Sequence, residues 1–171
     1  MRPDRIIVGE VRGPEAATLL TAMNTGHDGS FGSLHANTAQ ETVTRMINPP
    51  MSVPPIMLTG LDLIIIQARL HVNGKTARKI TEVAEIAGME GSKPRLNTIW
   101  KYNASTDQIE ETGIPSNLRE VICRAAGVTP DVFEKHVNQR QQIIEDLIAR
   151  DITDIQSVTT VIQNFYAQSH H

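Results

Sequence analysis

The sequence predicts an α/β fold followed by an all-α domain, and three observations lead to this prediction. Short β-branched runs alternate with helix-like segments as far as residue 111. An Asn-Gly pair at residues 73–74 separates two strand-like runs, which is typical of a β-hairpin. From residue 112 onwards the apolar residues recur only at helical spacing. We therefore expect two domains, at residues 1–111 and 112–171.

The first part of the α/β region is expected to alternate strands and helices. Its predicted elements are a strand at residues 5–11, a helix at 14–23, a strand at 30–35, a helix at 38–46 and a short helix at 54–59. The first strand is a short, continuous, β-branched run, which is typical of a buried strand. Pro14 suits the first turn of a helix, and Thr38 and Glu41 have the spacing of a capping box.

A hairpin, one more strand and a helical tail are expected to follow. The predicted elements are strands at residues 63–70 and 79–86, a loop at 88–92, a strand at 96–102, and helices at 116–124, 130–150 and around 158–165. β-branched residues bounded by turn residues identify the strands. Gly127 and Asp151 separate the three helices, because glycine and short acids favour helix ends and turns.

Composition excludes several classes of protein. Of the 171 residues 40% are hydrophobic, and the net charge of −3 gives no basic excess to attract nucleic acid or anionic lipid. Cys123 is the only cysteine, so an intrachain disulfide and an all-cysteine zinc site are both excluded. No apolar run reaches the ~18 residues of a membrane span. Because the chain has no basic excess, we expect no nucleic-acid partner.

Glu10 is the first residue that can carry chemistry. It ends the first predicted strand and precedes a Gly-Pro turn into a helix. Ligands of open α/β sheets bind at the carboxyl ends of strands. A carboxylate there can hold Mg²⁺ through water or accept a proton from an attacking water. An acid that merely ends a strand in solvent is the simpler interpretation on spacing alone.

Two histidines are the second candidates. His27 follows the end of a helix, and His35 ends the next predicted strand. If both reach the same sheet edge, they can contact a terminal phosphate. A zinc centre needs further ligands, which Glu10 and Asp28 can supply, although no compact His-x-x-x-His spacing is present. Ordinary polar loop histidines are the third interpretation.

The segment at residues 74–76, Gly-Lys-Thr, resembles the end of a phosphate-binding P-loop. The first glycine of such a loop would stand at residue 69, which is Arg69. The segment also lies at the predicted hairpin turn and leads into a strand instead of a helix. We therefore expect a turn here, and no other stretch of the chain has the P-loop spacing.

Two motifs in order point to a known family. Residues 5–12, with their acid directly after a glycine, resemble the Walker B strand of the type II/type IV secretion and pilus ATPases, and residues 25–38 resemble the His box of that family. Residues 48–69 and 82–90 are similar to its archaeal members, which drive archaella, pili and secretion. The tail after Asn117 is similar to their helical C-terminal domain.

The archaeal-like branch is further indicated by Gly13, which stands where many bacterial relatives have an acid after the Walker B arginine. The resemblance implies one half of a RecA-like P-loop NTPase core, without its Walker A half, followed by the helical domain. The chain begins a few residues before the Walker B strand and thus resembles a C-terminal fragment.

The resemblance also implies site residues, cofactors and partners. Glu10 would position Mg²⁺ through water, His27 and His35 would contact the γ-phosphate, and Arg12 would tie the Walker B turn to its surroundings. ATP and Mg²⁺ belong to the full-length parent, and neither is expected to bind this chain alone. The parent is expected to be a cytoplasmic hexamer that meets a membrane platform protein at the inner face of the cell membrane.

Three functions remain open. The first is a hexameric ATPase that couples ATP hydrolysis to protein export or filament assembly, with this chain inactive alone because the Walker A backbone and lysine hold the phosphates. The second is a non-catalytic module that self-associates, or docks on a secretion or pilus machine, through exposed strand edges and apolar faces. The third is a metal-dependent hydrolase that uses Glu10, His27 and His35.

Overall fold

The computed structural model describes residues 3–72 and 74–169. Met1 and Asn73, which belong to the predicted chain start and hairpin turn, lie outside the described residues. The chain forms two compact units, residues 1–118 (unit 1) and 119–171 (unit 2). The fold is mixed α/β, as predicted, while the domain boundary at residues 111–112 stays a prediction.

A small parallel sheet opens unit 1. Strand β1 (Ile7–Val8) pairs with β2 (Phe31–Gly32), and helix α1 (Glu15–Asn24) connects them. The predictions of longer strands at residues 5–11 and 30–35 are wrong, because the regular strands cover only two residues of each segment and only single backbone hydrogen bonds continue beyond them. Ile7 is 65% exposed and Phe31 is 57% exposed. Parallel strands are normally buried because other strands and helices cover them. This sheet has only two strands among the described residues, so these side chains stay exposed.

The two helices of unit 1 begin where the sequence predicts. The carboxylate of Glu15 accepts hydrogen bonds from the backbone N–H groups of Arg12 and Gly13, at 2.8 and 3.0 Å, at the start of α1. Helix α2 (Ala39–Ile47) starts after Thr38, whose hydroxyl accepts from Glu41 N at 3.0 Å. The capping box is only half formed, since the Glu41 carboxylate accepts from the backbone of residue 37.

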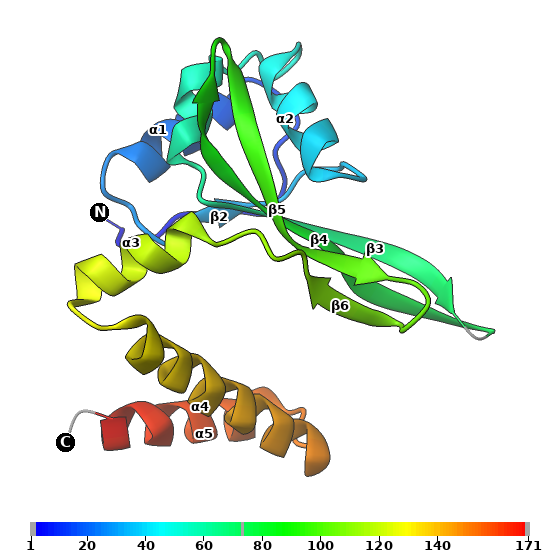
Figure 1. Ribbon diagram of the computed structural model, residues 1–171, viewed down its shortest axis with the longest axis vertical. Coiled ribbons are helices and arrows are strands. Elements are labelled where there is room, and N and C mark those ends of the chain that lie inside the picture. The colour runs from blue at the N-terminus through cyan, green and yellow to red at the C-terminus, as the bar shows by residue number, and fades with distance from the viewer. Residues whose placement is uncertain (1–2, 73, 170–171) are drawn as a thin grey trace. The chain divides into compact units, whose positions relative to one another are not determined.

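A four-stranded antiparallel ladder forms the rest of the sheet structure. Its strands are β3 (Leu63–Val72), β4 (Lys75–Glu90), β5 (Lys93–Asn103) and β6 (Gln108–Glu111), in the order β3-β4-β5-β6. The short 3₁₀ helix η1 (Pro55–Gly60) precedes the ladder. Figure 1 shows α1 and α2 gathered at one end of the ladder, with the β3–β4 hairpin extending away from them.

The predicted hairpin is confirmed, and the predicted loop at residues 88–92 is too long, because only residues 91–92 form the turn between β4 and β5. Pairing of β3 with β4 continues to Val72 and Lys75, and Gly74 adopts a φ of 75° in the turn. Strand β4 runs through the glycine at position 88 because the pairing shifts between Ile86 and Met89. Gly88 has a φ of 104°, so it marks a bulge within the strand.

The apolar core of unit 1 lies between the helices and the ladder. It contains buried side chains from α1, α2, the segment around η1 and strands β3 and β4, among them Leu20, Val43, Val53, Leu58, Ile64 and Ala84. Two polar residues are buried with them, Thr42 and Glu85. This core fixes α2 beside β3, and with it the segment that leads into α2.

Helices α3 (Asn117–Ala126), α4 (Pro130–Ala149) and α5 (Ile155–Ser169) complete the described chain. Gly127 adopts a φ of 65° after α3, and the Thr129 hydroxyl accepts from the backbone at the start of α4. Arg140 of α4 lies over the ring of Phe165 in α5, 5.6 Å from its centre. None of the helices in the described residues is both long and apolar enough to cross a membrane.

Candidate functional site

Glu10 and His35 lie just beyond the ends of the two parallel strands. Ser33 N donates to Val8 O at 3.3 Å, and Val11 N donates to Ser33 O at 2.8 Å. These bonds continue the parallel pairing past β1 and β2. The two segments therefore carry Glu10 and His35 to the same edge of the sheet, where ligands of α/β proteins bind.

The Glu10 carboxylate lies between two basic side chains. Its Oε1 atom is 2.6 Å from Arg12 Nε and 3.0 Å from His35 Nε2. Oε1 is shielded from solvent and has no hydrogen bond of good geometry, so these two contacts are ion pairs. The close approach of the Arg12 guanidinium, followed by the charges of Arg12 and His35, holds the pKa of Glu10 below its ordinary value. Glu10 is therefore a carboxylate at neutral pH.

The side chains of Glu10, Arg12 and His35 differ in their exposure to solvent. The side chain of Glu10 is 32% exposed, whereas those of Arg12 and His35 are 75% and 84% exposed. Backbone hydrogen bonds at Val8 and Val11, before and after Glu10 along the chain, fix the backbone that carries it. His35 stands on the segment before α2 and presents most of its imidazole to solvent, so the ring can meet a ligand as well as Glu10.

His27 lies apart from this pair. Its Nδ1 is 3.2 Å from the carbonyl oxygen of Ala22, in the turn that follows α1. Over the described part of the chain no hydrogen bond or ion pair joins His27 to Glu10 or His35. The same residues contain no group of three or more His, Cys, Asp or Glu side chains able to hold a metal ion, so the centre with Glu10 and both histidines is not formed.

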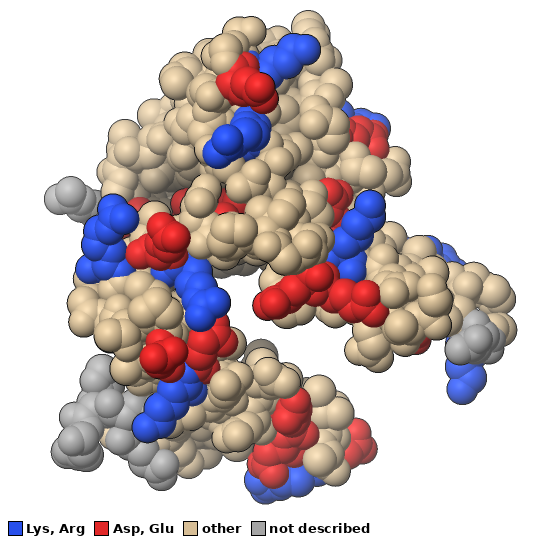
Figure 2. Space-filling view, in the orientation of Figure 1, with Lys and Arg blue, Asp and Glu red and all other residues tan. Residues whose placement is uncertain are grey.

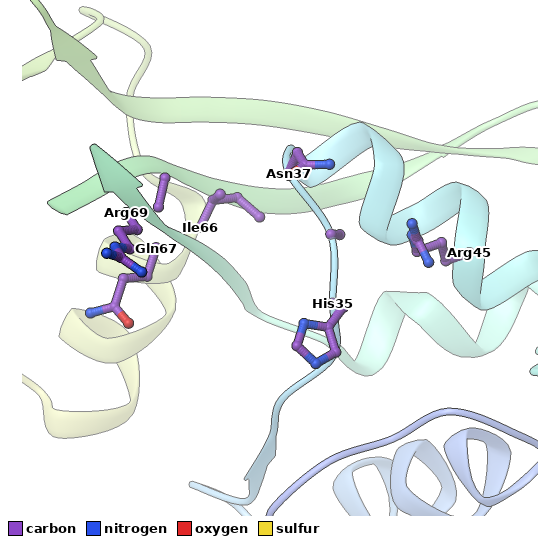
Figure 3. Close-up of a pocket in the computed structure, with 8 residues that line it drawn as sticks. His35, Asn37, Arg45, Ile66, Gln67 and Arg69 are labelled. Carbon is purple, nitrogen blue, oxygen red and sulfur yellow. The ribbon is translucent and has the colours of Figure 1, made fainter. Parts of the chain in front are cut away.

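A pocket next to His35 was not predicted from the sequence. It has a volume of about 330 Å³ and lies between the segment before α2, helix α2 itself and strand β3. Figure 3 shows Gln67 and Arg69 on β3 at one side, Arg45 reaching from α2 at the other, and the His35 ring between them in this view. The nearness of Arg69 to His35 depends on how α2 packs on β3.

A second acidic residue with an altered pKa was also not predicted from the sequence. Asp62 lies directly before β3, and its pKa is raised by burial first and then by the negative charges of Asp28 and Glu85.

Figure 2 shows basic and acidic side chains intermixed over the face of the molecule that the figure presents. That distribution agrees with the small net charge of the chain.

A carboxylate and an imidazole at the shared end of two parallel strands, followed by an antiparallel ladder and helices, define the candidate site and its setting. Residues 1–163 match the family described as type II/IV secretion system protein. The chain belongs to this family. The resemblance predicted from the Walker B-like and His-box-like segments is confirmed.

Several relatives are similar to large parts of this chain. The uncharacterized protein MJ0781 of Methanocaldococcus jannaschii is 36% identical over 136 residues, 78% of this chain and 19% of that protein. A putative conjugal transfer protein of Mycobacterium tuberculosis is 39% identical over 104 residues, 58% and 29% of the two chains. The type IV pilus assembly ATPase PilB of Pseudomonas aeruginosa is 46% identical over 67 residues, 38% and 11%. The chain thus spans less than a third of each of these relatives.

Proposed function

We propose that this chain is part of an ATPase that couples ATP hydrolysis to protein export or filament assembly. The observation that carries the proposal is the 3.0 Å ion pair between Glu10 and His35 at the shared end of two parallel strands. The name of the Pseudomonas relative, a pilus assembly ATPase, supports the same activity. Membership of the secretion family supports its use in moving protein.

In this proposal Glu10 orients water for attack on the terminal phosphate. The lowered pKa keeps its carboxylate charged at neutral pH, which is the state that accepts a proton or holds a magnesium-bound water. Arg12 holds the carboxylate in place through their ion pair. His35 contacts or senses the γ-phosphate with its exposed ring, and we assign His27 the same role from its place in the His-box-like segment.

The residues of this chain fit one part of a site for ATP and Mg²⁺. Glu10 is a carboxylate at the end of a parallel strand, and a carboxylate can hold a magnesium-bound water. The 171 residues contain no Gly-x-x-x-x-Gly-Lys-Ser/Thr stretch to cradle phosphates. ATP supplies the phosphoanhydride bond that is broken. We infer that the chain alone is inactive and binds Mg-ATP no more tightly than about 1 mM.

The architecture of the whole motor is also part of the proposal. We infer that β1, α1, β2 and α2 belong to a RecA-like core whose remaining part lies in the longer parent, and that residues 112–171 form an all-α domain. The parent acts as a hexamer at the inner face of the cell membrane and meets a membrane platform protein. The greater length of the relatives supports this arrangement.

The decisive experiment uses a full-length protein that contains this chain. Glu10→Gln is expected to keep ATP binding and to lower the hydrolysis rate by about 100-fold or more, because the amide cannot accept the proton of the attacking water. Glu90→Gln, which changes an exposed glutamate at the end of β4, is the matched control and is expected to hydrolyse ATP normally. Unchanged turnover in Glu10→Gln would remove the proposal.

A non-catalytic interaction module is the alternative function. The observation that favours it is the exposure of Ile7 and Phe31 on the short parallel sheet. Open strand edges with apolar side chains favour association with another subunit or a second copy. Light scattering of the 171-residue chain at high concentration tests this, since a monomer without self-association contradicts it.

A further inference from the structure

The pocket beside His35 is rich in hydrogen-bond donors. Two guanidinium groups (Arg45 and Arg69), one imidazole (His35) and two side-chain amides (Asn37 and Gln67) line it. No aspartate or glutamate is among its lining residues. Such a lining is unusual for a chain with a net charge of −3, and it concentrates positive potential in a volume of about 330 Å³.

The two arginines of the pocket differ in their partners. Arg45 is bound by Glu41 one turn earlier on α2, with its Nε 2.8 Å and its Nη2 2.6 Å from the same carboxylate oxygen. For the Arg69 side chain the described residues provide no hydrogen bond and no ion pair. Arg69 therefore lines the pocket with a charge that no carboxylate among the described residues neutralises.

A second cation stands directly opposite Arg69. Arg69 and Arg78 are cross-strand partners in the β3–β4 ladder, and both are exposed. Like charges at directly opposite positions destabilise a sheet, because their Cβ atoms are only about 5 Å apart. An anion bound near Arg69 relieves this repulsion. The arrangement thus points to an anionic ligand, independently of the donors that line the pocket.

We propose that this pocket binds a phosphate group, with Arg69 as its principal charged ligand and Gln67 and His35 as further donors. Asn37 can add one N–H of its amide, since its Nδ2 also donates to Glu41 Oε2 at 3.0 Å. Arginine pairs with phosphate through two parallel N–H donors, and amides and an imidazole supply the remaining hydrogen bonds. The inference rests on the proposed function only for the source of the phosphate. Since His35 contacts both Glu10 and the pocket, that source is either nucleotide or the inorganic phosphate that hydrolysis releases.

Phosphate binding to the 171-residue chain tests the proposal without any measurement of ATP hydrolysis. Inorganic phosphate is titrated and followed by ³¹P NMR, with ATP in the absence of Mg²⁺ as a second arm. Saturable binding with a Kd of about 1 mM or below is expected in at least one arm. Arg69→Gln is expected to weaken it roughly tenfold, because a charge-assisted bidentate contact is lost.

The control is Arg95→Gln, which removes the same charge from β5. Arg95 donates to Ala87 O at 3.1 Å and is not among the residues that line the pocket. This variant is expected to bind phosphate like the unmodified chain. Binding only of inorganic phosphate identifies the product as ligand, and binding only of ATP identifies nucleotide. Equal affinity in the Arg69→Gln and Arg95→Gln variants, or no saturation in either arm, overturns the proposal.

Loss of this site and failure of the proposed function are distinguishable. The ATPase proposal fails if Glu10→Gln leaves hydrolysis unchanged in the parent, whatever the chain does with phosphate. The pocket proposal fails if Arg69→Gln leaves phosphate binding unchanged, whatever Glu10 does. Circular dichroism of Arg69→Gln confirms that the ladder is intact, as expected for replacement of an exposed side chain.

Discussion

Two glutamates of unit 1, one just beyond the parallel strands and one within the antiparallel ladder, have opposite surroundings. Glu10 lies at the open end of the parallel strands, between two basic side chains that are mostly exposed to solvent. Glu85 lies in the middle of β4 and is only 2% exposed. Its carboxylate accepts hydrogen bonds from the hydroxyl of Ser116 and from Asn117 N, the latter at 2.7 Å.

This difference separates a structural carboxylate from the one to which the proposed function assigns a role in hydrolysis. Glu85 satisfies the backbone at the start of α3, where the partial positive charge of a helix favours an anion, so its hydrogen bonds fix both the sheet and the helix start. Glu82, on the same strand, accepts from Ala39 N at 2.8 Å at the start of α2. Glu10 has ion pairs with partners that are mostly exposed to solvent instead, which leaves it able to exchange them for a ligand.

The comparison is tested most severely by removing the buried carboxylate. Glu85→Ala is expected to lower the free energy of unfolding by about 2–3 kcal/mol, because it removes two hydrogen bonds and opens a cavity beside the core. Glu82→Ala removes a half-buried carboxylate and is expected to cost about 1 kcal/mol. Urea denaturation of the 171-residue chain measures both values.

Glu10→Ala provides the contrasting measurement in the same series. Its ion pairs lie at an exposed edge, and such pairs contribute little to stability, so its urea midpoint is expected to match that of the unmodified chain. If Glu10→Ala destabilised the chain as much as Glu85→Ala, the distinction between the two carboxylates would be lost.

Asp62 gives a smaller effect of the opposite sign. Burial and the charges of Asp28 and Glu85 raise its folded pKa, so the folded state favours the protonated acid. As pH rises through that pKa, the charged form appears and stability falls. Asp62→Asn is therefore expected to raise the unfolding free energy at pH 7 by less than about 1 kcal/mol, with no gain at pH 3, where the acid is already protonated. A variant less stable than the unmodified chain at pH 7 would contradict this.

The sequence predicts the neighbourhood of Glu10 and His35 because a strand-end rule is local. Glu10 follows a β-branched run and His35 ends the next predicted strand, and the carboxyl ends of parallel strands meet at one edge. Glu85 and Arg69 are different cases. An acid in an alternating strand indicates a solvent face, and its burial here depends on Ser116, 31 residues further on. The position of Arg69 depends on the register shift between Ile66 and Gln67 and on the packing of α2.

Predicted strand lengths fail for a related reason. The run at residues 5–11 has the composition of a fully covered strand, yet β1 has only β2 as a partner among the described residues. An apolar, β-branched composition indicates that a strand is suited to burial. How many of its residues pair depends on which neighbouring strands are present. The loop predicted at residues 88–92 is too long because Gly88 is accommodated by a bulge, which local glycine content does not distinguish from a turn.

The smallest effect expected from the comparison concerns the titration of Glu10. Arg12 and His35 lower the folded pKa of its carboxyl, so the ion pairs are complete above the unfolded pKa and are lost as pH falls through the folded value. Carbon-13 NMR of the labelled chain is expected to show a Glu10 midpoint below the ordinary value for a glutamate. Arg12→Gln should move this midpoint upwards, because the guanidinium has the largest effect on it. An unchanged midpoint would contradict this prediction. It would mean that the charged neighbours of Glu10 do not set the pKa of its carboxyl.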